Sequence, residues 1–114
     1  MVSPDNFIFL RHIQDSCRKI REFIKDLDYE KFTTDEKTVS AVLRELSVVG
    51  EAARKTTDNF RNSHPQISWE EIFGMRNKLV HDYTGVQLPV VWQTVQEDIP
   101  NLEKTVNEIL KSEK

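Results

Sequence analysis

The stretch LRHIQDSCRKIREFIKDL, residues 10–27, repeats apolar side chains at alternating steps of three and four residues. This spacing places them along one side of an α-helix, while charged and amide side chains occupy the other sides. Ser3 is a suitable N-cap and Pro4 a suitable first helical residue, so we expect the helix to begin there and to run to about Asp28. The apolar stripe consists of Leu10, Ile13, Cys17, Ile20, Ile24 and Leu27.

A second helix with the same period follows. Thr33 and Glu36 form a capping box, which predicts a helix from there to about Thr57. Gly50 in its middle costs roughly 1 kcal/mol relative to alanine, and we expect the close approach of another helix to explain it. Residues 58–66 predict a polar connection to the next helix. The apolar stripe of this second helix consists of Val39, Val42, Leu46, Val49 and Ala53.

Two further helices complete the predicted set. Ser68 and Glu71 form another capping box, and Gly85 is placed to close this third helix. A fourth helix opens around Leu88, and Pro100 should kink it because proline has no backbone N–H. Four helices with short links predict an all-α fold, an antiparallel four-helix bundle.

The composition agrees with a small helical protein. The chain has 114 residues, of which 38% are hydrophobic and 31% charged, so we expect one domain over residues 1–114 and no membrane span. A net charge of −3 predicts no general affinity for nucleic acid, and RNA binding would need a local cluster of positive charge. We expect no DNA partner. The start of the chain has no basic segment typical of a signal peptide, so we expect a cytoplasmic protein.

Nothing in the sequence suggests a metal or cofactor. Cys17 lies in the apolar stripe of the first helix, so we expect a buried, unreactive thiol. A single cysteine gives no cysteine-based zinc site, and His12, His64 and His81 lack the spacing of metal ligands. The chain also has no glycine-rich phosphate loop, so we expect no cofactor.

The segment GMRNKLVHDY, residues 74–83 in the predicted third helix, contains a misplaced charge. Arg76 lies four residues after an isoleucine and three before a leucine, so a helical wheel puts it on the apolar stripe, with Tyr83 on the same face. A guanidinium there is costly unless it is paired or lies at an interface or cleft. On the same wheel His81 shares a face with Asn77. The alternative is that Arg76 reaches out of the core to solvent and that His81 caps the helix end.

Residues 76–81, RNKLVH, resemble the Arg-x4-His signature of HEPN ribonucleases, and residues 76–83 resemble the Arg-x4-His-x-Tyr form found in HepT toxins. The similarity spans essentially the whole chain. Asp82 occupies a position that is often small in relatives, and its charge would repel phosphate. The flanking segments that agree are RELSVVGEA at 44–52, HPQISW at 64–69, VWQTV at 91–95 and DIP at 98–100.

The resemblance implies an endoribonuclease toxin that works without a metal and is restrained by a partner nucleotidyltransferase of the MntA type. It implies a homodimer in which two copies of the motif face each other across the two-fold axis, so that the stripe carrying Arg76 would be interface rather than closed core. Arg76 and His81 would be the catalytic residues. Tyr83 would accept AMP from the partner, adding bulk and negative charge where RNA must bind.

The chemistry of RNA cleavage fits these residue types. Without a metal, the reaction needs a base for the 2′-OH proton, an acid for the leaving oxygen and positive charge on the phosphate. Histidine has an ordinary pKa of about 6.5, so His81 can serve as base or acid near neutral pH. Arg76 can hold phosphate oxygens through two parallel hydrogen bonds, and Asn77 could orient the imidazole or bind phosphate.

Two other functions are open from the sequence. One is a catalytically inactive HEPN module that binds a nucleotidyltransferase or a nucleotide. The other is a dimeric helical scaffold in which the motif is a coincidence. Cleavage of RNA in the presence of a chelator would favour the nuclease, whereas tight partner binding without cleavage would favour the module.

Overall fold

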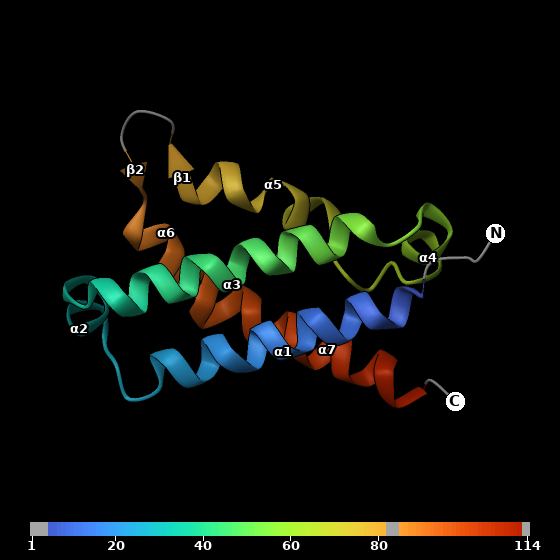
Figure 1. Ribbon diagram of the computed structural model, residues 1–114, viewed down its shortest axis with the longest axis horizontal. Helices are drawn as coiled ribbons and strands as arrows, with labels where there is room; N and C mark the ends of the chain where they lie inside the picture. The colour runs from blue at the N-terminus through green and yellow to red at the C-terminus, as the bar shows by residue number, and fades with distance from the viewer. Residues whose placement is uncertain (1–4, 82–84, 113–114) are drawn as a thin grey trace.

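Two long helices that run in opposite directions form the centre of the molecule (Figure 1). They are α1 (Asn6–Ile24) and α3 (Glu36–Lys55), which pack closely against each other. The computed structural model describes residues 5–81 and 85–112, and for residues 76–78, 80 and 81 it describes the backbone alone. The predicted stripes of both helices form the core, as expected: Leu10, Ile13, Cys17 and Ile20 from α1, and Val42, Leu46, Val49 and Ala53 from α3, are buried.

Helix α1 is shorter than the sequence predicts. Its N-cap is Asp5, whose carboxylate accepts a hydrogen bond from the backbone N–H of Phe7 at 3.0 Å. Ser3 and Pro4, the predicted start, lie outside the described residues. The helix ends at Ile24 rather than near Asp28, because the chain turns through Asp26 with φ 66°, in the left-handed region.

A short helix, α2 (Tyr29–Thr34), takes up the residues that were predicted to cap the second long helix. Thr33 therefore lies inside α2, and the cap of α3 is Asp35. The Asp35 carboxylate accepts hydrogen bonds from the Thr38 hydroxyl at 2.7 Å and from the Thr38 N–H at 3.1 Å. These bonds stabilise the charged form and lower the pKa of the carboxyl.

Residues 58–66 are not a plain polar connection, because they contain helix α4 (Asp58–Ser63). Thr57 caps this helix by accepting from the N–H of Phe60 at 3.2 Å. The Phe60 ring is buried and meets the Phe7 ring edge-on, with 5.5 Å between the ring centroids. The contact that stabilises α4 therefore comes from α1, far away in the sequence.

Helix α5 (Trp69–Leu79) begins directly after Ser68, as predicted, but it ends well before Gly85. The chain continues as strand β1 (Val80–His81), which pairs antiparallel with β2 (Gly85–Val86). The expected helix through Tyr83 is therefore wrong. Gly85 has φ +80°, a backbone conformation that glycine adopts without strain.

Residues 88–112 are helical in three consecutive pieces. They are α6 (Leu88–Gln93), a π-helical turn η1 (Thr94–Asp98) and α7 (Ile99–Ser112), which packs against α1. The N–H of Ile99 donates to the carbonyl of Thr94, five residues earlier. The kink predicted at Pro100 stays a prediction: the irregularity that the structure shows is this wider turn at Thr94–Asp98, and Pro100 lies in the first turn of α7.

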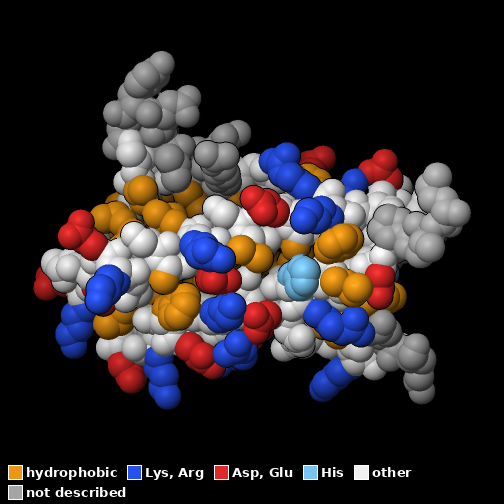
Figure 2. Space-filling view, in the orientation of Figure 1, with side chains coloured by type: hydrophobic (Ala, Val, Ile, Leu, Met, Phe, Trp, Pro, Cys, Tyr) orange, Lys and Arg blue, Asp and Glu red, His pale blue; other side chains and the backbone are white. Residues whose placement is uncertain are grey.

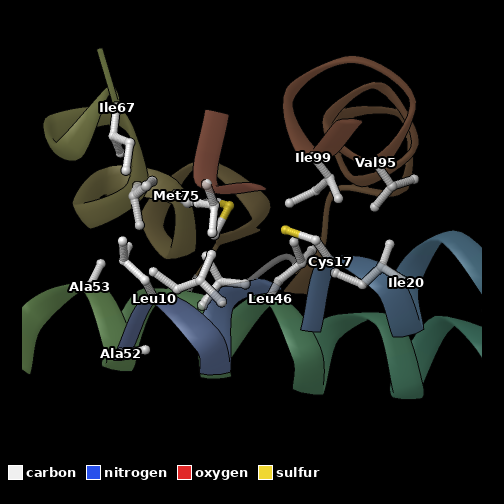
Figure 3. Close-up of a cluster of buried hydrophobic side chains, with 14 of the residues drawn as sticks. Leu10, Cys17, Ile20, Leu46, Ala52, Ala53, Ile67, Met75, Val95 and Ile99 are labelled. Atoms are coloured by element: carbon white, nitrogen blue, oxygen red, sulfur yellow. The ribbon is translucent and has the colours of Figure 1, made fainter. Parts of the chain in front are cut away.

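The molecule is mostly helical, as the sequence predicts, and its core joins several elements. Figure 3 shows side chains from α1 and α3 meeting Met75 of α5, Val95 of η1 and Ile99 of α7. The start of α1 and the end of α7 lie at one end of the molecule, and the β1–β2 hairpin lies at the other (Figure 1). The longest dimension is 46 Å. Among the described residues, no helix is both long and apolar enough to cross a bilayer.

Candidate functional site

The predicted site residues lie where α5 gives way to the hairpin. Arg76 and Asn77 are in the second half of α5, whereas His81 is in β1. The helical wheel that put His81 on the face of Asn77 and Tyr83 on the face of Arg76 therefore does not hold beyond Leu79. Tyr83 lies outside the described residues, and the meeting of the Arg76, Asn77 and His81 side chains stays a prediction.

The start of α5 is held firmly. The indole Nε1 of Trp69 donates to the carbonyl of His64 at 3.0 Å, and Nδ1 of His64 lies 2.9 Å from the carbonyl oxygen of Phe60. Along α5, the positions four before and three after Arg76 are both buried, since Ile72 and Leu79 are 8% and 2% exposed. Arg76 therefore belongs to a helix whose neighbouring positions on that stripe face inward, as the spacing predicts.

The hairpin fixes the backbone of His81. Val80 lies opposite Val86, and His81 lies opposite Gly85. The N–H of Gln87 donates to the carbonyl of Leu79 at 2.8 Å, which gives the end of α5 a hydrogen-bond partner. A β-strand rather than a helix thus carries the backbone of the predicted catalytic histidine.

A groove of about 450 Å³ runs between α3 and α5, and we call it the α3–α5 groove. Its floor is apolar, and its rim carries Glu51 and Arg54. Gly50 opens into it, because a Cβ built at Gly50 would meet nothing within 4 Å. The expected close approach of another helix at Gly50 is therefore wrong within this chain. The groove is lined by Leu43, Leu46, Ser47, Gly50, Glu51, Arg54, Ile72, Phe73, Met75 and Leu79.

Two guanidinium groups flank one ring beside this groove. The Cζ atoms of Arg54 and Arg61 lie 5.7 and 5.4 Å from the centroid of the Phe73 ring. Arg61 also pairs with Asp58, whereas Arg54 donates to the carbonyl of Phe73 at 3.2 Å and has no carboxylate partner among the described residues. The sequence analysis missed this cluster, because its members lie far apart in the chain and no local pattern joins them.

The outer faces of α1 and α3 carry charges of both signs. Figure 2 shows Lys and Arg side chains interspersed with Asp and Glu over α1 and α3. The buried carboxylate of Glu45 accepts a hydrogen bond from the Ser16 hydroxyl at 2.8 Å, so it links α3 to α1 instead of facing a cleft. Among the side chains that the structure describes, no three from His, Cys, Asp or Glu are grouped to hold a metal ion.

Comparisons with known proteins agree on one family. The family model described as "Ribonuclease HepT-like" matches residues 13–109. A protein of Caldanaerobacter subterraneus whose name provisionally describes it as an RNase is 41% identical over 93% of this chain and 95% of its own length. "Probable ribonuclease HepT" of Thermococcus cleftensis is 40% identical over 90% of this chain and 94% of its own length.

A third relative is a longer protein. It comes from Methanocaldococcus jannaschii, its name joins a gamma-glutamylcyclotransferase to a provisional RNase, and it is 35% identical over 91% of this chain but only 47% of its own length. No solved structure matches this chain. The family model covers most of the sequence, including the segment from Arg76 to His81. The chain therefore belongs to the HepT-like ribonuclease family.

Proposed function

We propose that this protein is an endoribonuclease that cleaves RNA without a metal, at a site built around Arg76 and His81. The observation that carries the proposal is the Arg-x4-His motif at the junction of α5 and β1, in a chain that matches the HepT-like family over residues 13–109. Relatives with ribonuclease names support RNA cleavage as the activity.

The proposed reaction is an internal transfer at phosphorus. A base removes the 2′-OH proton, the 2′-oxygen attacks the adjacent phosphorus, and the bond to the 5′-oxygen breaks as an acid gives that oxygen a proton. His81 supplies the base or the acid, because an imidazole changes its charge near neutral pH. Arg76 stabilises the charge that builds on the phosphate oxygens, and Asn77 orients the imidazole or binds the phosphate. The products are a 2′,3′-cyclic phosphate and a 5′-hydroxyl.

We propose that the active form is a homodimer in which each protomer supplies one motif, so that one His81 is neutral and the other protonated. The α3–α5 groove supports this, since its apolar floor borders the helix that carries Arg76. Gly50 leaves room for a close approach by a second copy. Glu51 and Arg54 on the rim have opposite charges, so a two-fold contact can pair each with its counterpart.

We propose further that a nucleotidyltransferase antitoxin restrains the enzyme by transferring AMP to Tyr83. A phosphodiester-linked AMP on that hydroxyl would add bulk and negative charge two residues after His81, in the motif that must bind the RNA phosphate. Co-expression with such a partner should add one or more AMP masses to Tyr83. An unmodified Tyr83 in a fully neutralised complex would contradict this part of the proposal.

The decisive experiment uses labelled RNA and the purified protein in the presence of EDTA. Arg76→Ala and His81→Ala should each reduce the cleavage rate by about a hundredfold or more, because each removes a group that acts on the reacting atoms. His12→Ala and Arg44→Ala are matched controls on exposed parts of α1 and α3 and should leave the rate unchanged.

Two outcomes would contradict the proposal. Undiminished cleavage by Arg76→Ala or His81→Ala would remove that residue from the site, and cleavage that EDTA abolishes would contradict a metal-free reaction. Tight binding of a nucleotidyltransferase or a nucleotide without any cleavage would instead favour an inactive binding module.

A further inference from the structure

A second hollow lies on the other side of α5, and we call it the α5–α7 pocket. It has a volume of about 420 Å³ and lies between the first half of α5, the π-helical turn η1 and α7. Ile72 and Met75 of α5 and Ile99 of α7 form part of its floor, and Met75 and Ile99 are labelled in Figure 3. Two exposed carboxylates, Glu71 and Asp98, belong to its lining.

The charge of this pocket differs from that of the α3–α5 groove. Among the side chains that the structure describes, its lining contains the two carboxylates and no lysine or arginine, whereas the groove carries Arg54 as well as Glu51. Within the described part of the chain, neither Glu71 nor Asp98 forms an ion pair. Two exposed carboxylates repel RNA phosphates and attract a cation. The two flanks of α5 are therefore suited to different molecules.

The apolar floor narrows the choice of cation. A side chain with an aliphatic stem and a charged tip can lay its stem on Ile72 and Met75 and bring its tip to the carboxylates. Gly74 is part of the wall, and a Cβ there would meet nothing within 4 Å, so a polypeptide backbone can come close. Arginine and lysine within a protein segment meet both requirements.

We propose that the α5–α7 pocket is a docking site for an arginine or lysine side chain, flanked by an apolar side chain, of a partner protein. From Glu71 to the end of α5 at Leu79 is roughly 12 Å of helix, and β1 with His81 follows directly, which is within the width of a standard protein interface. A partner anchored in the pocket therefore reaches the hairpin without entering the α3–α5 groove. The docking chemistry is independent of the proposed function. The further step, that this partner is the protein that restrains the enzyme, rests on the proposed function.

The experiment uses two capped peptides as probes, acetyl-Leu-Arg-Leu-amide and acetyl-Leu-Glu-Leu-amide, with the protein labelled at isoleucine and leucine methyl groups for NMR. The arginine peptide should shift the methyl signals of Ile72, Ile99 and Leu102 in a saturable way, and the glutamate peptide should not. The double variant Glu71→Gln/Asp98→Asn should weaken binding roughly tenfold.

The chain offers matched controls for both carboxylates. Glu70 and Glu97 are the exposed neighbours of Glu71 and Asp98, and neither lines the pocket. Glu70→Gln/Glu97→Gln makes the same change in net charge and should bind the arginine peptide like the unmodified protein. Both double variants should cleave RNA at the unmodified rate, because no carboxylate that they alter belongs to the catalytic site.

Three results would overturn the docking proposal. They are the absence of a saturable shift with the arginine peptide, equal weakening by the two double variants, and tighter binding of free spermidine than of the peptide at the same methyl groups. The last result would make the pocket a site for a small cation. If the protein binds the peptide but cleaves no RNA, the docking proposal stands and the proposed ribonuclease activity is contradicted. Failure of the docking proposal and failure of the proposed function are therefore distinguishable.

Discussion

At the scale of single residues, Cys17 shows how burial controls chemistry. Its side chain is 0% exposed in the contact between α1 and the rest of the core, as its place in the apolar stripe predicts. Burial raises the pKa of this thiol from 9.0 to about 12. The thiolate, which is the reactive form, is therefore absent at neutral pH, and Cys17 has no part in the proposed reaction.

This pKa predicts a loss of stability in alkali. Above pH 9 the unfolded chain releases the thiol proton while the folded chain keeps it up to pH 12, so the contribution of Cys17 falls as the pH rises through that window. The difference in the free energy of unfolding between the unmodified protein and Cys17→Ala should shrink by about 1.4 kcal/mol for each pH unit above 9. Urea titrations at pH 8, 9.5 and 10.5 measure it. A difference that is constant over this range would show that the thiol ionises equally easily in both states.

At the scale of elements, the sequence predicts the faces of the helices better than their ends. The period of the apolar residues fixes the inner sides of α1 and α3, because burial repeats with the helical turn. The local sequence does not show which of two neighbouring residues caps α3, because Thr33 and Asp35 are both good N-caps. In the structure Thr33 belongs to α2, so Asp35 is the cap. The end of α5 was mispredicted for a related reason, since Gly85 suits both a helix end and the strand that it joins.

A substitution at Gly85 tests how far the hairpin depends on a positive φ angle. Because its φ is +80°, Gly85→Ala should cost about 1–2 kcal/mol of stability and displace the backbone of His81, with which it pairs. The cleavage rate should fall with the loss of pairing. Gly74→Ala is the control, since a Cβ there meets nothing within 4 Å and no positive φ is involved. Urea unfolding and the RNA assay measure both variants, and an unchanged stability of Gly85→Ala would show that the hairpin does not depend on this backbone conformation.

At the scale of the whole molecule, the helical class follows from the sequence, but the hollows beside α5 do not. Their linings combine residues from distant parts of the chain, such as Gly50 with Phe73 and Glu71 with Asp98, and no local pattern reports such a juxtaposition. The motif identifies the residues of the candidate site, and the structure adds that a hairpin, not a helix, carries the backbone of His81. The surfaces available to a second copy or a partner are visible only in the three-dimensional structure.

A substitution in the α3–α5 groove tests the proposed dimer. Gly50→Leu should keep the fold, because leucine has a higher helix propensity than glycine and the groove has room for it. It should weaken the dimer roughly tenfold to a hundredfold, since overpacking an interface costs about 1–3 kcal/mol, and cleavage should fall in step. Gly74→Leu makes the same change on the opposite side of α5 and should leave the dimer and cleavage intact. Sedimentation velocity measures the outcome, and a Gly50→Leu protein that still dimerises fully would place the interface elsewhere.

The start of α1 and the end of α7, which lie opposite the hairpin, also have a practical and an evolutionary meaning (Figure 1). An affinity tag, a surface tether or a fluorescent label attached before α1 or after α7 is joined at the end of the molecule away from the hairpin (Figure 1). For the same reason, a second domain fused before α1 or after α7 should leave the hairpin uncovered.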